Sequence, residues 1–375
     1  MDFRVPLSRP DVNESDIQAV VEVLRSPYLS LGPKVREFEA CFEHYVGRKY
    51  AVAVNSGTSG LFLCLKAMGL GPGDEVITTP FTFIATVTTI LMTGAKPVFA
   101  DIDPVSLNLD VKEVEKKITK RTKAIVPVEV FGNPAGMEEI YELAKAYRLE
   151  ILEDCCEALG SEINGRKAGT FGRAGVFAFY PNKQMTTGEG GMIVTDDETI
   201  ARLCISLRNQ GRGSGGGWLA HERLGYNYRL SDINCALGIS QIRRIEEFVR
   251  KRQQVAQMYL ERLAGEKRIV LPRVPEGVRM SWFVFVIRLA ESYQLQQRNE
   301  VLTRLMERGI QVSNYFPPVY LQPFIAEALG HKSGDFPVTD FISARTIALP
   351  FHNNLSRQEV ELVCTELQGI LDQMG

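Results

Sequence analysis

The chain has 375 residues, 45% hydrophobic and 23% charged, which is enough for two domains with a large core and excludes a disordered or low-complexity protein. Its 43 basic and 45 acidic side chains leave a formal net charge of −2, which argues against nucleic acid or an anionic membrane as a partner. The composition therefore favours a small metabolite as the ligand.

Short apolar runs alternate with helical segments between about residues 50 and 195, a pattern typical of a mostly parallel sheet with helices on both faces. The run at 51–54 is followed by a predicted helix over 56–69. The further runs that a predicted helix separates from one another are 75–78, 97–100, 124–128 and 150–153. We therefore expect a doubly wound α/β core.

The next two runs, 176–179 and 192–194, are only about a dozen residues apart, which is too close for a helical crossover. We expect an antiparallel pair there, with Lys183 in the connecting loop. The glycine-rich stretch 213–217 is expected to be a mobile loop.

A long helix is predicted over 232–264. We expect its charged clusters to form a solvated face; they are 243–244, 246–247 and 250–252.

The C-terminal part of the chain has the pattern of a smaller α+β domain. A strand is predicted at 281–287, and helices are predicted near 296–307 and 356–374. We expect a large cofactor-binding domain over 1–250 and a small domain over 251–375, with the N-terminal segment free to pack on the small domain.

The cysteines and the hydropathy pattern indicate a cytoplasmic protein without a membrane span. The seven cysteines are an odd number, and Cys155 and Cys156 are neighbours, which is poor geometry for a disulfide, so we expect reduced core thiols. No apolar run approaches the roughly eighteen residues that cross a bilayer, and no signal-peptide pattern follows Met1.

Three features carry the candidate chemistry. The run Asn-Ser-Gly-Thr-Ser-Gly at 55–60 opens a helix and suits a phosphate, although an ordinary helix cap would look the same. Asp154 ends a core strand, where ligands of such sheets gather, but a simple capping role is the alternative. Lys183 lies among apolar residues, a proline and glycines, which suits a desolvated nucleophile, whereas most lysines are solvated surface charges.

Together these features are the parts of a pyridoxal phosphate site: an anchor for the phosphate, a partner for the ring nitrogen, and an amine. The chain resembles the DegT/DnrJ-type sugar aminotransferases, which are fold-type-I pyridoxal-phosphate enzymes. The resemblance covers nearly the whole chain and rests on the segments 5–10, 31–33, 38–39, 55–59, 80–86, 153–154, 183–191, 225–230 and 315–318.

The resemblance implies roles for individual residues. Lys183 would form the internal aldimine, and Asp154 would pair with the pyridinium nitrogen. Phe83 would stack on the ring, and Gly57 and Thr58 would bind the phosphate.

Further residues are implied at the substrate side and at a subunit interface. Asn227 would reach the phosphate of the neighbouring subunit, which implies a homodimer with shared active sites. The candidate substrate contacts are Arg229, Tyr315 and Tyr320, and no metal site is expected.

The chain departs from the family pattern at three positions. Ala178 stands where a serine often helps to hold the phosphate, and Tyr320 stands where a histidine is common. Glu157 replaces a glutamine or histidine near the cofactor's phenolic oxygen, so it either carries a proton, turns toward a cation or alters the aldimine.

The resemblance implies transfer of an amino group, usually from glutamate, to a nucleotide-linked ketosugar. A dehydratase of the same family is the nearest alternative, but such enzymes have histidine in place of the lysine, so Lys183 speaks against it. A regulatory protein that binds the cofactor without turnover stays open. An NAD-linked oxidoreductase is disfavoured because the chain has no G-x-G-x-x-G motif.

Overall fold

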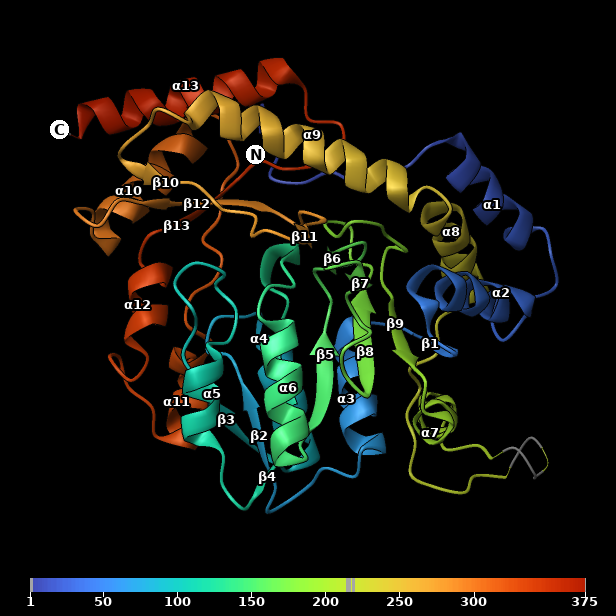
Figure 1. Cartoon of the computed structure of the whole chain (residues 1–375). Coiled ribbons are helices and arrows are strands. Elements are labelled where there is room, and N and C mark those ends of the chain that lie inside the picture. Colours follow the sequence, from blue (N-terminus) through green and yellow to red (C-terminus); the bar gives the residue numbers. More distant parts are fainter. Residues whose placement is uncertain (1–2, 214–216, 218–219, 375) are drawn as a thin grey trace.

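The computed structural model describes residues 3–213, 217 and 220–374, which form a seven-stranded central sheet with helices on both faces (Figure 1). In spatial order its strands are β1 (Tyr50–Val54), β9 (Gly191–Thr195), β8 (Ala174–Ala178), β5 (Glu150–Asp154), β4 (Thr122–Val126), β2 (Glu75–Thr78) and β3 (Lys96–Phe99). Strand β9 is antiparallel to both of its neighbours, and the other pairs are parallel. The predicted mostly parallel sheet and the antiparallel pair at its β8–β9 end are confirmed.

Helices bury both faces of this sheet, as the near-continuous apolar strands require. One face packs against α3 (Gly57–Ala67), α4 (Ile84–Thr93) and α7 (Glu198–Arg208). The other face packs against α5 (Val111–Lys117) and α6 (Met137–Tyr147) at one end of the sheet. At the other end it packs against α2 (Pro33–Phe42), α8 (Asp232–Ile242) and α9 (Ile245–Leu263). Helix α1 (Glu14–Leu24) lies beside α8.

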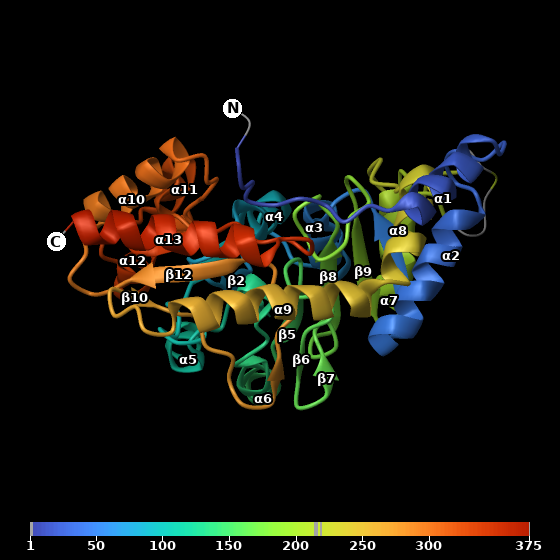
Figure 2. The same cartoon turned by 90° about the horizontal axis from the view of Figure 1, so that it is seen from above.

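The C-terminal part contains a second, three-stranded antiparallel sheet made of β10 (Ile269–Val270), β12 (Phe285–Leu289) and β13 (Thr346–Leu349). Its helices are α10 (Leu295–Glu307), α11 (Pro323–Leu329), α12 (Pro337–Ser343) and α13 (Arg357–Gln373). Helix α9 runs from the large sheet to this layer, where it lies beside α13 (Figures 1 and 2). A small third sheet joins β11 (Val278–Arg279), β6 (Glu162–Ile163) and β7 (Arg166–Lys167).

The long helix predicted over 232–264 is two helices. It breaks at Arg243 and Arg244, because Arg244 leaves helical geometry (φ −105°, ψ 6°) to become the cap of α9. Its guanidinium donates to the buried Asp16 carboxylate at 2.7 Å, which fixes the turn against α1. The turn allows α9 to leave the direction of α8.

The solvated face predicted for the charged clusters is wrong at two positions. Arg243 and Arg250 are exposed, whereas Arg244 is half-buried and Arg252 is only 3% exposed. The apolar side of α9 packs against both sheets, and Arg252 lies on that side among buried backbone carbonyls.

Two more predictions need correction or fall outside the described residues. The predicted strand 281–287 begins as regular strand only at Phe285, because Trp282 has a positive φ of 55° that no strand accommodates. The expected mobile loop at 213–217 lies mostly outside the described residues. In the part of the chain that the structure describes, no helix is long and apolar enough to span a membrane.

Candidate active site

A cavity of about 770 Å³ opens at the carboxyl ends of the parallel strands, where ligands of open α/β sheets bind. Its walls come from the start of α3, the segment before α4, the end of β5, the β8–β9 loop and residues 314–319. Five of the segments that the sequence singled out, 55–59, 80–86, 153–154, 183–191 and 315–318, therefore meet in one place.

Lys183 extends into this cavity from the β8–β9 loop, and its side chain is 14% exposed. The ammonium nitrogen Nζ lies 3.5 Å from Glu157 Oε1 and 3.9 Å from the centre of the Phe283 ring. These two contacts, one with a carboxylate and one with an aromatic face, fix the position of the amine in the cavity.

Asp154 stands at the end of β5 and is 5% exposed. Its Oδ2 accepts a 2.7 Å hydrogen bond from Thr86 Oγ1, and its Oδ1 accepts one of 3.2 Å from the Cys156 N–H. These donors fix the orientation of the carboxylate, and each oxygen keeps a lone pair for a cationic partner in the cavity. The element that follows β5 is strand β6, so the alternative of a helix-capping role for Asp154 is wrong.

Glu157 is buried beside Lys183 and accepts a 2.9 Å hydrogen bond from the Phe131 N–H on its second oxygen. Burial raises the pKa of Glu157, while the nearby Lys183 ammonium lowers it, and the net shift is upward. Of the three alternatives for Glu157, the geometry supports the one in which its carboxyl turns toward a cation.

The start of α3 forms a cradle beside these side chains. Ser56 caps the helix by accepting a 3.0 Å hydrogen bond from the Ser59 N–H, so the backbone at Gly57 and Thr58 faces the cavity at the positive end of the helix. A β-carbon at Gly57 would lie 2.8 Å from both Ala178 Cβ and Cys156 Sγ. Glycine at this position therefore lets the start of α3 pack directly against these two side chains.

Phe83 and Tyr315 also line the cavity. Phe83 is 61% exposed, and Tyr315 stacks on Phe283 at 6.2 Å between ring centres. The aromatic rings of Phe83 and Tyr315 thus line the same cavity as the Lys183 side chain.

Three predicted residues do not line the cavity. Asn227 is exposed, and its backbone bridges Asn209. Arg229 donates to the side chains of Asn209 and Gln210, at 2.9 Å each.

Tyr320 does not support the expected substrate contact. It is fully buried among aromatic residues, and its hydroxyl donates to Asp340 at 2.6 Å. A tyrosine at this position fills the core between α4 and α11, which explains why its side chain does not reach the cavity.

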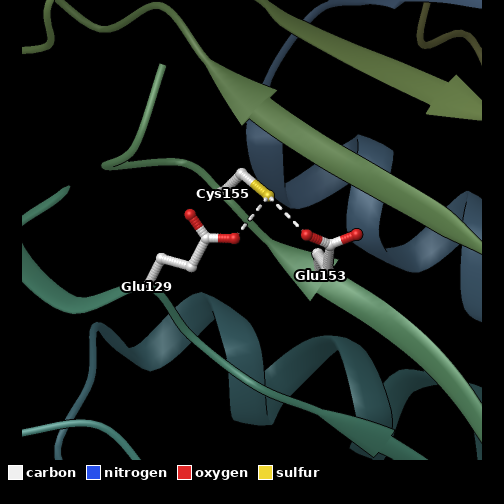
Figure 3. Close-up of side chains that lie close together, drawn as sticks. All are labelled: Glu129, Glu153 and Cys155. Atoms are coloured by element: carbon white, nitrogen blue, oxygen red, sulfur yellow. Dashed lines mark hydrogen bonds between the residues drawn. The ribbon is translucent and has the colours of Figure 1, made fainter. Parts of the chain in front are cut away.

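Next to Asp154, the buried residues Glu129, Glu153 and Cys155 lie close together (Figure 3). The Cys155 thiol donates to Glu129 Oε1 at 3.5 Å, and Glu153 accepts from the Gly169 and Gly172 N–H groups at 2.8 and 2.5 Å. Burial first, and then the neighbouring Glu153 carboxylate, raise the pKa of Glu129 far above its ordinary value. Burial and the close approach of the two carboxyl groups thus favour the protonated form of Glu129.

Sequence reasoning missed several residues of the site. Thr86 was part of a recognised segment, but its bond to Asp154 depends on tertiary packing. Glu129 is a charged residue within the apolar run 124–131, and this interruption was the sequence signal for a buried carboxyl group. Phe283 and Arg252 carry no local signal, because they approach Lys183 from the C-terminal part.

The cysteines match the expectation in part. All seven are free thiols; Cys155 is buried in the core, whereas Cys156 is half-buried and lines the cavity.

Comparison with known proteins agrees with this geometry. Residues 10–368 match the model of the DegT/DnrJ/EryC1/StrS aminotransferase family. The chain belongs to this family. Its relatives in it include the spore coat polysaccharide biosynthesis protein SpsC of Bacillus subtilis, which is 39% identical over 98% of this chain and 97% of its own length. The GDP-perosamine synthase of Caulobacter vibrioides is 34% identical over 98% of both chains.

A solved structure of this aminotransferase family has the same fold. Spr1654 of Streptococcus pneumoniae, described as a sugar aminotransferase, superposes in its pyridoxal-phosphate form with a TM-score of 0.92, at 28% identity over 98% of this chain and 99% of that one. The fold is thus that of the fold-type-I aminotransferases, and the cofactor of this aminotransferase is pyridoxal phosphate. The helix start at Gly57 and Thr58, the strand-end Asp154 and the amine of Lys183 line one cavity, and they fit that group.

Proposed function

We propose that this aminotransferase moves an amino group from glutamate to the keto group of a nucleotide-linked sugar, which leaves 2-oxoglutarate and an amino sugar. The observation that carries the proposal is the convergence of Lys183 and Asp154 on one cavity with a phosphate cradle. The names of relatives support the substrate class, since one is a GDP-perosamine synthase and another is a spore coat polysaccharide biosynthesis protein.

Pyridoxal phosphate, when bound, supplies an aldehyde that amines attack and a pyridinium ring that withdraws electrons. Gly57 and Thr58 would hold the phosphate with backbone N–H groups, and Phe83 would lie against the ring. Asp154 would accept a hydrogen bond from the protonated ring nitrogen, and the bond from Thr86 orients its carboxylate for that role.

Lys183 has two tasks in this proposal. Its amine would hold the cofactor covalently while the enzyme is at rest, and in its free form it would be the base that removes the proton from the donor's α-carbon. Glu157 lies 3.5 Å from that nitrogen and stabilises its positive charge between these steps. Retention of Lys183 disfavours the dehydratase alternative.

The charges of the cavity support a homodimer with shared sites. Among the described residues, the charged side chains lining the cavity are one cation, Lys183, and three acids, Asp154, Glu157 and Glu189. A phosphate and a nucleotide add further negative charge, so additional donors and cations are needed. Asn227 and Leu224 are exposed, Leu224 by 82%, which suits contact with a second copy.

We place the enzyme in the cytoplasm. Its seven cysteines are free thiols, which is the state that a reducing compartment maintains.

The test is an assay with pyridoxal phosphate, glutamate and a panel of nucleotide-linked ketosugars that includes GDP-linked ones. Formation of 2-oxoglutarate that depends on one of these sugars supports the proposal. Formation of 2-oxoglutarate in a first half-reaction with no turnover on any sugar would contradict the substrate class, and bound cofactor without either half-reaction would favour the regulatory alternative.

A further inference from the structure

Arg252 is a buried arginine on α9 that donates hydrogen bonds to backbone carbonyls of two other segments. Its Nη1 donates to the carbonyls of Trp282 and Phe283, both at 3.0 Å, and its Nη2 donates to the carbonyl of Lys183 at 2.9 Å. Its guanidinium also lies 5.6 Å from the centre of the Phe351 ring. One side chain of α9 thus ties two distant chain segments together.

One of these two segments contains Lys183 itself, and the other contacts the amine at the end of its side chain. The latter carries the Phe283 ring, which lies 3.9 Å from Nζ. The Phe283 N–H donates to the Phe131 carbonyl at 3.1 Å, and the Phe131 N–H donates to Glu157 at 2.9 Å. Since Glu157 contacts Nζ, the contacts form a closed ring around the lysine side chain.

Two residues in or beside this closed set of contacts have an uncommon backbone geometry. Phe131 and Trp282 have φ values of 60° and 55°, in the left-handed region that residues with bulky side chains rarely occupy. Such geometry persists when surrounding bonds hold it. Arg252 supplies two of those bonds next to Trp282.

We propose that Arg252 is a positioning residue that fixes the Lys183 backbone and the Phe283 ring as one unit, so that the amine stays between that ring and Glu157. This inference rests on the proposed role of Lys183. The planar fork of arginine suits several carbonyls at once, which a lysine ammonium does with less defined geometry. Burial lowers the pKa of Arg252 to about 10, so the side chain still carries its charge at neutral pH.

The test measures how the cofactor is captured. Apoenzymes of wild type, Arg252→Gln and Arg252→Lys receive pyridoxal phosphate, and borohydride fixes the bound cofactor at successive times. Peptide mass mapping then gives the rate of labelling at Lys183, and heating without cofactor gives the thermal midpoint. Arg250→Gln is the matched control, because Arg250 is an exposed arginine on the same helix.

We expect Arg252→Gln to slow labelling of Lys183 by about tenfold, with Arg252→Lys intermediate and Arg250→Gln equal to wild type. In turnover, kcat should fall while KM for the amino donor stays unchanged, since the donor does not touch Arg252.

The inference is overturned if Arg252→Gln melts at a lower temperature but labels Lys183 and turns over at the wild-type rate, because Arg252 is then only structural. If Arg252→Gln does not fold, Arg252→Lys decides by the same criterion. Absence of label at Lys183 in the wild type would instead contradict the proposed function.

Discussion

The amine of Lys183 lies 3.5 Å from the carboxylate of Glu157, and both side chains are largely withdrawn from solvent. The Phe131 N–H holds the other carboxylate oxygen at 2.9 Å and thereby aims Glu157 at the lysine. Glu157 thus places a carboxylate beside Lys183 Nζ, the nitrogen that we propose attaches to the cofactor.

Glu157→Gln should shift the pH at which the visible band of the cofactor-loaded enzyme changes. Removing the carboxylate destabilises the protonated nitrogen, so the midpoint should move to lower pH by about one unit. An absorbance titration measures it, with Glu189→Gln as the control, because Glu189 lines the same cavity but is exposed. An unchanged midpoint in Glu157→Gln, or an equal shift in the control, would contradict the assigned contact.

Glu129→Gln should stabilise the fold, and the gain should grow with pH. The folded state raises the pKa of Glu129 above its ordinary value of 4.5, so the free energy of unfolding of the wild type falls as the pH rises above that value. The amide needs no proton, so we expect the gain to be larger at about pH 8 than at about pH 5, by about 1.4 kcal/mol for each pH unit over which Glu129 stays protonated only in the folded state. Urea unfolding at both pH values measures this, with the exposed Glu139→Gln as control. A gain independent of pH would contradict a protonated Glu129.

Asp154→Asn should keep bound cofactor but reduce kcat by about a hundredfold or more, because a neutral amide does not hold the charge on the ring nitrogen. Thr86→Val should give a smaller loss, since it removes only the 2.7 Å bond to Asp154. Steady-state kinetics at saturating cofactor compares the two. Turnover of Asp154→Asn close to wild type would refute the role of Asp154.

Asn227→Ala should weaken cofactor binding about tenfold to a hundredfold, the usual effect of losing a hydrogen bond to a charged group. Mixing inactive Lys183→Ala subunits with Asn227→Ala subunits should then restore activity toward half of the wild-type value per dimer, because one site of each hybrid carries neither change. Exchange of subunits must be shown separately by labelling. Hybrids no more active than the Asn227→Ala parent would mean that Asn227 serves its own chain.

The sequence was sufficient for the parts of the fold and site that short segments encode. The apolar runs that became β5, β8 and β9 are local patterns, and they place Lys183 and Asp154 at the same sheet edge. The roles of Arg252 and Tyr320 were misread because their burial depends on packing between distant segments. An arginine in a run of charges looks solvated until the carbonyls that it meets are known.

The most direct test of the account follows the nitrogen itself. Wild type and Lys183→Ala, loaded with pyridoxal phosphate, are incubated with glutamate labelled by a heavy nitrogen isotope and a nucleotide-linked ketosugar, and the sugar product is weighed by mass spectrometry. We predict a labelled amino sugar from the wild type and none from a correctly folded Lys183→Ala. Labelled product from Lys183→Ala at the wild-type rate would contradict the account, as would a wild type that transfers no nitrogen to any sugar of the panel.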